Sequence, residues 1–304
     1  FDRDLFNSKI LSVFYDLIPL LNPELYFTDN LEFEKFYNSK LEKLTEVDAL
    51  LAISESSAKE ITQYLHYDSK SVFNISSACD KKIFNTHRLI TPTDAISSIL
   101  NTSFLLYTGA GDPRKNLKGL LEAYSLLPNS LKHFKLVLAG NLIKPEIELI
   151  DNWIKSLGID SKNVIKTGYI SDDDLVVLYR KCYLFIFPSF HEGFGLPVLE
   201  AMTCGAPVIA SNTTSMPEVI GNTKAMFDPN DPFKIKQLIQ KVLCNNQFRN
   251  ELVVSSKVQS EKFSWSQTAK SIIHACNQSL KNSQDINRYS SWKSIINKNA
   301  INQE

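Results

Sequence analysis

Hydrophobic and polar positions alternate most regularly between about residues 103 and 281. Short apolar runs, which predict buried strands, alternate there with longer runs whose apolar residues recur at helical spacing. Strands are predicted at residues 104–107, 135–139, 164–166, 183–187, 207–210 and 225–227. Helices are predicted at residues 117–127, 146–157, 172–181, 196–204 and 233–243. Strict alternation of this kind predicts an α/β fold with a parallel, doubly wound sheet.

The first 85 residues show the same alternation, with strands predicted at 10–15, 50–53 and 72–75. Ser54 or Ser57 would cap a helix over 58–65. Three strands and two or three helices make about half of a Rossmann-like domain, so residues 1–85 are predicted to form an incomplete one that lacks its opening units. Residues 86–102 are predicted to be a linker and 103–281 a second domain. The polar tail, 282–304, is predicted to form a terminal helix or to fray.

Composition narrows the function classes. Lys plus Arg and Asp plus Glu both number 33, so the balanced charge argues against a nucleic-acid partner. The five cysteines are odd in number and widely spaced, which favours free thiols in a reducing cytoplasm over disulfides or a zinc site. We find no apolar run of about 18 residues and no signal peptide.

The longest motif follows the predicted strand at 183–187 and opens a helix; it reads PSFHEGFGLPVLEA over residues 188–201. Gly193 and Gly195 would let the backbone approach a ligand closely. Together with Phe194 and Leu196 they would place N–H groups at a helix N-terminus, which suits a diphosphate. The carboxyl ends of parallel strands are also where such sheets bind ligands.

Two acids in this motif, Glu192 and Glu200, are eight residues apart, so one helical face would not present both. Glu192 is predicted in the loop beside a bound sugar. Glu200 is predicted within the helix, where a carboxylate can accept both hydroxyls of a ribose. A glycine-rich turn with two surface acids is the simpler alternative, and the length of the motif weighs against it.

A second motif, YTGAGDPRKN over residues 107–116, also lies between a strand and a helix. Gly109 and Gly111 permit a tight loop, and Arg114 and Lys115 place two cations at the helix start. Cations there oppose the helix dipole, which a phosphate partner would explain. The alternative is that both are solvated loop residues. A dinucleotide fingerprint would need a third glycine where Arg114 stands, and no P-loop is present.

Together the two motifs resemble the donor domain of retaining glycosyltransferases of family four, which has the GT-B fold of two Rossmann-like domains. The family pattern, two Glu residues separated by seven intervening residues within S-x-x-E-G-F-G-L-P-x-x-E-A-M, matches residues 189–202. Residues 204–211, 217–221 and the Phe-Ser-Trp at 263–265 continue the likeness. DLIP at 16–19 and LAISESS at 51–57 resemble the second half of the family's N-terminal domain.

The resemblance implies a role for each matching residue. Glu192 would lie at the donor sugar, and Glu200 would bind the ribose. Arg114 and Lys115 would bind the diphosphate, and residues 193–196 would clasp the β-phosphate and sugar. The backbone at Gly168, Tyr169 and Ile170 would line the base.

Two departures from the family pattern stand out. Many members carry Gly-Arg where this chain has Gly109-Ala110, so Arg114 would have to supply that charge. Many also carry His-Asp where Tyr15-Asp16 stands, and tyrosine cannot replace a positive charge. The resemblance implies no resident cofactor and no metal; the acids at 172–174 are predicted to begin a helix instead.

The implied activity is transfer of a hexose from GDP-mannose or a UDP-hexose to a saccharide or lipid-linked acceptor, in the synthesis of a cell-surface polysaccharide or lipopolysaccharide. The partners would be the nucleotide-sugar donor and the saccharide acceptor. The resemblance is also compatible with peripheral association of the protein at the inner face of the cell membrane. Two alternatives remain at this point. One is a sugar-nucleotide epimerase of the same fold, and the other is a donor-binding fragment that needs a partner for the acceptor half.

Overall fold

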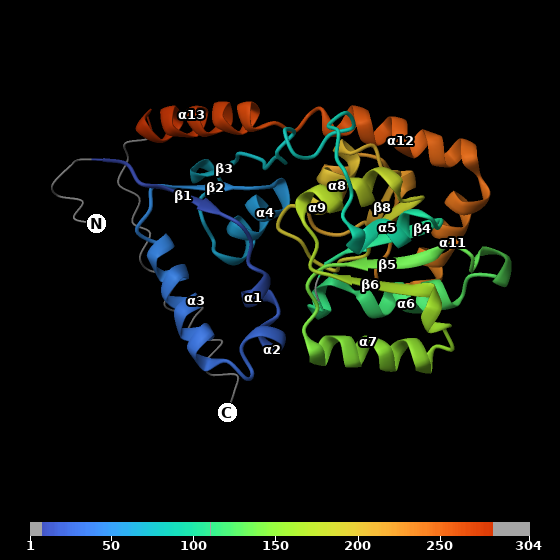
Figure 1. Cartoon of the computed structure of the whole chain (residues 1–304). Coiled ribbons are helices and arrows are strands. Elements are labelled where there is room, and N and C mark those ends of the chain that lie inside the picture. The colour runs from blue at the N-terminus through green and yellow to red at the C-terminus, as the bar shows by residue number, and fades with distance from the viewer. Residues whose placement is uncertain (1–7, 110, 282–304) are drawn as a thin grey trace. The chain divides into compact units, whose positions relative to one another are not determined.

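The computed structural model describes residues 8–109 and 111–281, which belong to two compact units (Figure 1). Unit 1 is formed from Phe1–Ser77 together with Trp265–Glu304, and unit 2 is Ala78–Ser264. The chain therefore leaves unit 1, completes unit 2 and then returns to unit 1.

Unit 2 contains a six-stranded parallel sheet in the order β6-β5-β4-β7-β8-β9. Its strands are β4 (Phe104–Thr108), β5 (Lys135–Ala139), β6 (Val164–Gly168), β7 (Leu184–Phe187), β8 (Val208–Ser211) and β9 (Met226–Phe227). Its helices are α5 (Asp94–Leu100), α6 (Leu117–Ser125), α7 (Lys144–Ser156), α8 (Asp172–Lys181), α9 (Leu196–Thr203), α10 (Met216–Ile220), α11 (Pro232–Cys244) and α12 (Asn246–Ser260). Helices α6 and α7 lie on one face and α8 and α9 on the other (Figure 1).

The strand order reverses direction between β4 and β7, which are neighbours in register at Leu105–Leu184 and Leu106–Phe185. From β4 the chain winds outward through β5 to β6, and from β7 it winds the other way through β8 to β9. In open α/β sheets the crevice at such a reversal, beyond the carboxyl ends of the strands, is where ligands bind. The loops after β4 and β7 carry the two motifs described above.

Local sequence explains where these helices begin. Ser171 accepts a hydrogen bond from the backbone N–H of Asp174, 3.1 Å away, so the predicted cap of α8 is confirmed. Pro197 occupies the first turn of α9, where the missing N–H costs nothing. The predicted linker at 86–102 differs, because it contains α5, whose Ile96 and Ile99 are buried.

Unit 1 contains a three-stranded parallel sheet in the order β1-β2-β3, formed by β1 (Leu11–Phe14), β2 (Ala49–Ala52) and β3 (Val72–Asn74). Its helices are α1 (Ile18–Leu21), α2 (Pro23–Tyr26), α3 (Leu31–Leu44), α4 (Glu55–Tyr64) and α13 (Trp265–Lys281). Ser54 caps α4 by accepting the backbone N–H of Ser57 at 2.9 Å.

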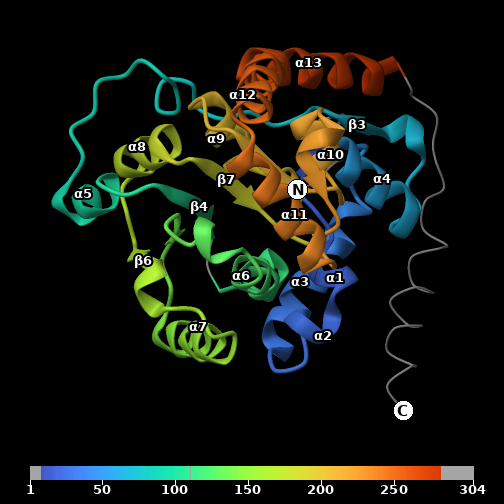
Figure 2. The ribbon, with the colours of Figure 1, turned by 90° about the vertical axis from the view of Figure 1, so that its right-hand side faces the viewer.

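The central strand β2 is buried on both faces. Leu50 packs in one cluster with residues of α3 and α4, whereas Leu51 packs in another with Ile75 and with Ala275 of α13. Successive side chains of a strand point to opposite faces, so α13 covers the face that the N-terminal helices leave open. Figure 2 shows α13 and β3 from a second direction.

The boundaries between the units differ from those predicted. The sequence placed them at residues 85, 102 and 281, whereas the compact units divide at 77/78 and 264/265. An amphipathic helix such as α13 does not reveal in its own sequence which sheet it covers, and α3, α12 and α13 were not predicted. The predicted terminal helix at 282–304 lies outside the described residues.

Candidate active site

The loop after β4 holds its two cations in a short 3-10 turn, Pro113–Lys115. Asp112 caps this turn by accepting the backbone N–H of Arg114 at 2.8 Å, and Asn116 caps the following helix α6 by accepting that of Gly119 at 3.2 Å. Asn116 adopts a left-handed backbone conformation, with φ of 54°, which asparagine tolerates better than most residues. These two caps fix the direction in which the loop presents Arg114 and Lys115.

Hydrogen bonds to backbone carbonyl oxygens join the loop after β4 to the loops after β7 and β9. The Asn116 side-chain amide donates to the carbonyl oxygens of Pro188, at 3.1 Å, and Pro229, at 2.8 Å. The N–H of Phe190 donates to the carbonyl of Arg114 at 2.9 Å. These bonds place the loop that carries Arg114 and Lys115 (residues 109–116, the cation loop) directly beside the loop at residues 188–195 (the glycine loop). Both lie where the strand order reverses.

Glu192 forms ion pairs with both cations. Its Oε1 lies 2.7 Å from Nζ of Lys115, and its Oε2 lies 2.8 Å from Nη1 of Arg114. The side chains are 17% exposed for Arg114, 16% for Lys115 and 10% for Glu192. The alternative that the two cations are ordinary solvated loop residues is therefore wrong.

Further polar groups hold Glu192. The Ser189 hydroxyl donates to its Oε1 at 2.7 Å, while its backbone N–H donates to Oγ1 of Thr214 at 3.1 Å and its carbonyl accepts the Ser215 hydroxyl at 3.0 Å. Thr214 has φ of 49°, an uncommon conformation for a β-branched residue and one that concentrates at functional sites. Sequence reasoning missed Asp112, Thr214 and Ser215; only Asn116, which stands before a predicted helix, carries a readable capping signal.

Gly195 allows the turn into α9. Its φ of 103° is unfavourable for any residue with a side chain, and a Cβ there would lie 2.2 Å from Cε of Met216. Phe194 is buried, with its ring 5.6 Å from that of Phe263 in an edge-to-face contact. The side chain of Phe194 thus supports the loop from inside, and the Phe-Ser-Trp motif supplies its partner.

Glu200 lies one turn into α9, as predicted. Its Oε2 accepts a hydrogen bond from the Tyr179 hydroxyl of α8 at 3.2 Å. Burial raises the pKa of the Glu200 carboxyl from 4.5 to about 7, although the Tyr179 hydrogen bond lowers it. The carboxylate therefore lacks part of its hydration, which leaves it ready to accept hydroxyl groups.

The remaining predicted residues are distributed along the same edge of the sheet. Gly109 follows β4, and its N–H donates to the carbonyl of Ala139 at 3.0 Å. A Cβ on Gly111 would lie 2.5 Å from the side chain of Glu146 at the start of α7. Gly168 ends β6 and has φ of 67°. Tyr169, which is 81% exposed, and Ile170 follow it. Ala110 lies outside the described residues.

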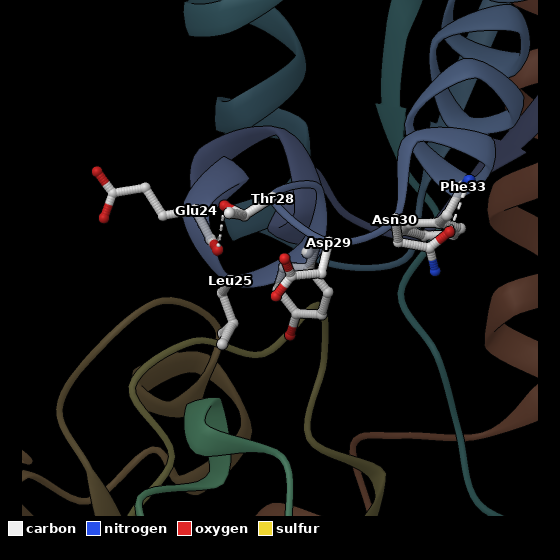
Figure 3. Close-up of a pocket in the computed structure, with 7 residues that line it drawn as sticks. Glu24, Leu25, Thr28, Asp29, Asn30 and Phe33 are labelled. Carbon is white, nitrogen blue, oxygen red and sulfur yellow. Dashed lines mark hydrogen bonds between the residues drawn. The ribbon is translucent and has the colours of Figure 1, made fainter.

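A pocket elsewhere does not coincide with these residues. It has a volume of about 530 Å³ and lies in unit 1 between Glu24 and Phe33 (Figure 3). The Glu24 side chain points away from those of Asp29 and Asn30, so the polar groups do not converge on one point (Figure 3). None of the predicted site residues lines this pocket.

Three further features of residues 8–109 and 111–281 concern metals, thiols and membranes. In this part of the chain no three or more His, Cys, Asp or Glu side chains are grouped to hold a metal ion. All five cysteines are free thiols, and Cys79, Cys182 and Cys204 are buried. None of the described helices is both long and apolar enough to cross a membrane.

Comparison with curated proteins gives relatives over most of the chain. The serotype-specific mannosyltransferase WbdA of Escherichia coli is 42% identical over 282 residues, which cover 91% of this chain and 34% of that protein. The chain thus spans about a third of the length of this relative. O-antigen chain mannosyltransferase B of Escherichia coli is 31% identical over 278 residues, covering 88% of this chain and 70% of that protein.

Solved structures share the fold. The Anabaena protein Alr3699/HepE, in complex with UDP and glucose, matches with a TM-score of 0.71 and 17% identity over 90% of this chain and 73% of its own. The sucrose-phosphate synthase of Thermosynechococcus elongatus matches with a TM-score of 0.72 and 22% identity over 92% and 70%. These likenesses confirm the predicted α/β fold of GT-B type with parallel sheets. The family model described as "Glycosyl transferases group 1" matches residues 94–258, and the chain belongs to that family.

Proposed function

We propose that the chain is a retaining hexosyltransferase that takes a hexose from a nucleoside diphosphate sugar. One observation carries this proposal: two cations and a carboxylate meet where the sheet reverses its strand order, beside the glycine-lined start of α9. This combination suits a diphosphate leaving group attached to a sugar.

Stabilisation of the leaving group is the main catalytic contribution in this proposal. As the bond between the sugar C1 and the phosphate oxygen breaks, the nucleoside diphosphate keeps the electron pair and gains negative charge. Lys115 and Arg114 stabilise that charge from partly buried positions, where they need little reorganisation. The helix N-terminus at Gly195 and Leu196 contributes oriented backbone dipoles, so the step requires no metal ion and no resident cofactor.

Retention follows from attack on the face that the leaving group vacates. The acceptor hydroxyl forms the new bond to C1 through an oxocarbenium-like state, and its proton passes to the departing phosphate oxygen. Glu192 stabilises and positions the sugar in this scheme and does not attack it.

The nucleoside is held at the same edge of the sheet. Glu200 accepts the ribose hydroxyls, and Gly168, Tyr169 and Ile170 line the base. The desolvated Glu200 carboxylate and the exposed Tyr169 ring support these assignments.

Mannose is the first hexose to test, because the relatives described above are named mannosyltransferases. We propose GDP-mannose as donor, with UDP-hexoses as the alternative. The acceptor is a saccharide or lipid-linked saccharide of a cell-surface polysaccharide, reached from the cytoplasmic face of the membrane.

Product analysis tests the proposal. The protein is incubated with GDP-mannose or UDP-hexoses, with and without mannose-terminated oligosaccharides, and the free nucleotide and the product anomer are measured. Nucleoside diphosphate released only with acceptor, together with a retained anomer, supports transfer. An altered sugar nucleotide without acceptor would identify an epimerase, and binding without turnover would identify a donor-binding module.

A further inference from the structure

The charges of the cation loop and of Glu192 balance one another before any nucleotide binds. Arg114 lies 3.3 Å from Asp112 and 2.8 Å from Glu192, and Lys115 lies 2.7 Å from Glu192. Two positive and two negative side chains therefore face one another. Every phosphate that binds here adds negative charge to a cluster that is already neutral.

A diphosphate and the Glu192 carboxylate would compete for the same cations. One carboxylate oxygen of Glu192 contacts Lys115 and the other contacts Arg114, so Glu192 occupies both cations. Like charges placed together in a partly desolvated site repel strongly, because solvent screens them poorly. We infer that Glu192 is an internal counter-ion, which holds Arg114 and Lys115 in the nucleotide-free protein and is displaced from them by the diphosphate. This inference rests on the proposed function.

Glu192 is better suited to this displacement than Asp112. One oxygen of Asp112 accepts the backbone N–H of Arg114, so moving it would uncap the turn that carries the cations. The backbone of Glu192 is held separately, by Thr214 and Ser215. Its side chain can therefore rotate away while the loop stays in place.

Removal of the negative charge of Glu192 should have opposite effects on nucleotide binding and on transfer. In Glu192→Gln the side chain keeps its size and can still accept the Ser189 hydroxyl, but it no longer neutralises the cations. We expect the Kd for nucleoside diphosphate to fall by about five- to tenfold, within the usual range of coupling between competing groups. Transfer should fall nevertheless, because the sugar loses its carboxylate.

The decisive measurement is calorimetric titration with GDP and with UDP. It compares the wild type with Glu192→Gln, Lys115→Ala and a matched control, Glu122→Gln. Glu122 pairs with Lys118 on α6, 3.9 Å away, so its change to glutamine removes the same charge from a surface pair. The control should bind nucleotide as the wild type does, and Lys115→Ala should bind more weakly.

The outcomes separate this inference from the proposed function. Tighter binding by Glu192→Gln supports the internal counter-ion. Equal or weaker binding, with Lys115→Ala still weakened, overturns the inference and leaves the proposed function standing. An absence of nucleotide binding by the wild type, or an undiminished affinity in Lys115→Ala, rejects both.

Thermal unfolding supplies a second readout. Without nucleotide, Glu192→Gln should melt below the wild type because two partly buried cations lose the carboxylate that they share, yet GDP or UDP should raise its Tm by more. Should this variant not fold, Glu192→Asp replaces it, since the shorter side chain withdraws the carboxylate from the cations. Its Kd should also lie below that of the wild type, and an unchanged or higher Kd overturns the inference.

Discussion

Glu192 and Glu200 lie eight residues apart on the same loop-and-helix segment, in opposite electrostatic surroundings. Glu192 is surrounded by two cations and a serine hydroxyl. Glu200 faces a tyrosine hydroxyl, and burial raises its pKa to about 7. One segment of the chain thus provides two different carboxylates. Glu192 is fixed by ion pairs, whereas Glu200 is partly desolvated by burial.

The largest expected effect is on the rate of transfer, and it should be confined to the cluster of Arg114, Lys115 and Glu192. Lys115→Ala and Glu192→Ala should each lower kcat/KM for transfer by at least ~100-fold, or about 3 kcal/mol of transition-state stabilisation. Steady-state kinetics with the donor found active will measure this. Lys118→Ala is the matched control, because Lys118 is 60% exposed beside Glu122. Rates near the wild type in both site variants would contradict the proposed mechanism.

The second largest effect is expected in the pH dependence of the free energy of unfolding, which should differ between variants of Glu192 and Glu200. Folding raises the pKa of Glu200 from 4.5 to about 7, so between these values the native protein binds more protons than the unfolded chain. The free energy of unfolding therefore falls as pH rises through this window, by a ceiling of about 3 kcal/mol from this group. Glu200→Gln removes this loss.

Chemical denaturation at pH 5 and pH 8 tests this. Glu200→Gln should gain stability relative to the wild type on going to pH 8, whereas Glu192→Gln, which loses a carboxylate paired with two cations, should be less stable than the wild type at pH 8. A constant difference between Glu200→Gln and the wild type at both pH values would show that Glu200 titrates normally.

Nucleotide affinity gives a smaller effect in the same pH range. If the ionised Glu200 carboxylate binds the ribose, the ionised fraction rises about tenfold from pH 6 to pH 8 at a pKa near 7, and the affinity rises with it. The phosphate titrates as well, so the comparison is with Glu200→Gln, which keeps only that part. Identical pH profiles for the two proteins would exclude Glu200 from ribose binding.

Ser189→Ala should have the smallest effect. The Ser189 hydroxyl donates to Glu192 at 2.7 Å and is buried, but two cations still hold the carboxylate. A loss of about 1 kcal/mol in stability is expected, less than is usual for a hydrogen bond to a charged group, because Arg114 and Lys115 still pair with the carboxylate. Thermal unfolding measures this, and a loss as large as that in Glu192→Gln would mean that Ser189 carries much of the cluster.

Local signals explain what the sequence predicted well. Helix α8 begins and ends at the predicted residues because a serine cap and three acids define its first turn. Gly195 and Pro197 likewise mark the start of α9 through their own backbone preferences. Such signals need no knowledge of distant parts of the chain.

Contacts between distant residues explain what it did not predict. Lys115 and Glu192 are 77 residues apart, and they meet only because β4 and β7 are neighbours in the sheet. Sequence patterns placed each residue in a loop, but not the carboxylate between the two cations. The left-handed Thr214, which binds the Glu192 backbone, has no local sequence signal at all.

The return of the chain to unit 1 has a consequence for synthesis. The strands of unit 2 are complete once Phe227 has been made, so its sheet can close while later residues are still on the ribosome. Unit 1 has all three strands early, yet Leu51 and Ile75 lack their cover until Ala275 emerges. The nascent chain must therefore carry this open apolar face while unit 2 is made, and the sheet that precedes unit 2 along the chain is covered only by a helix that follows it.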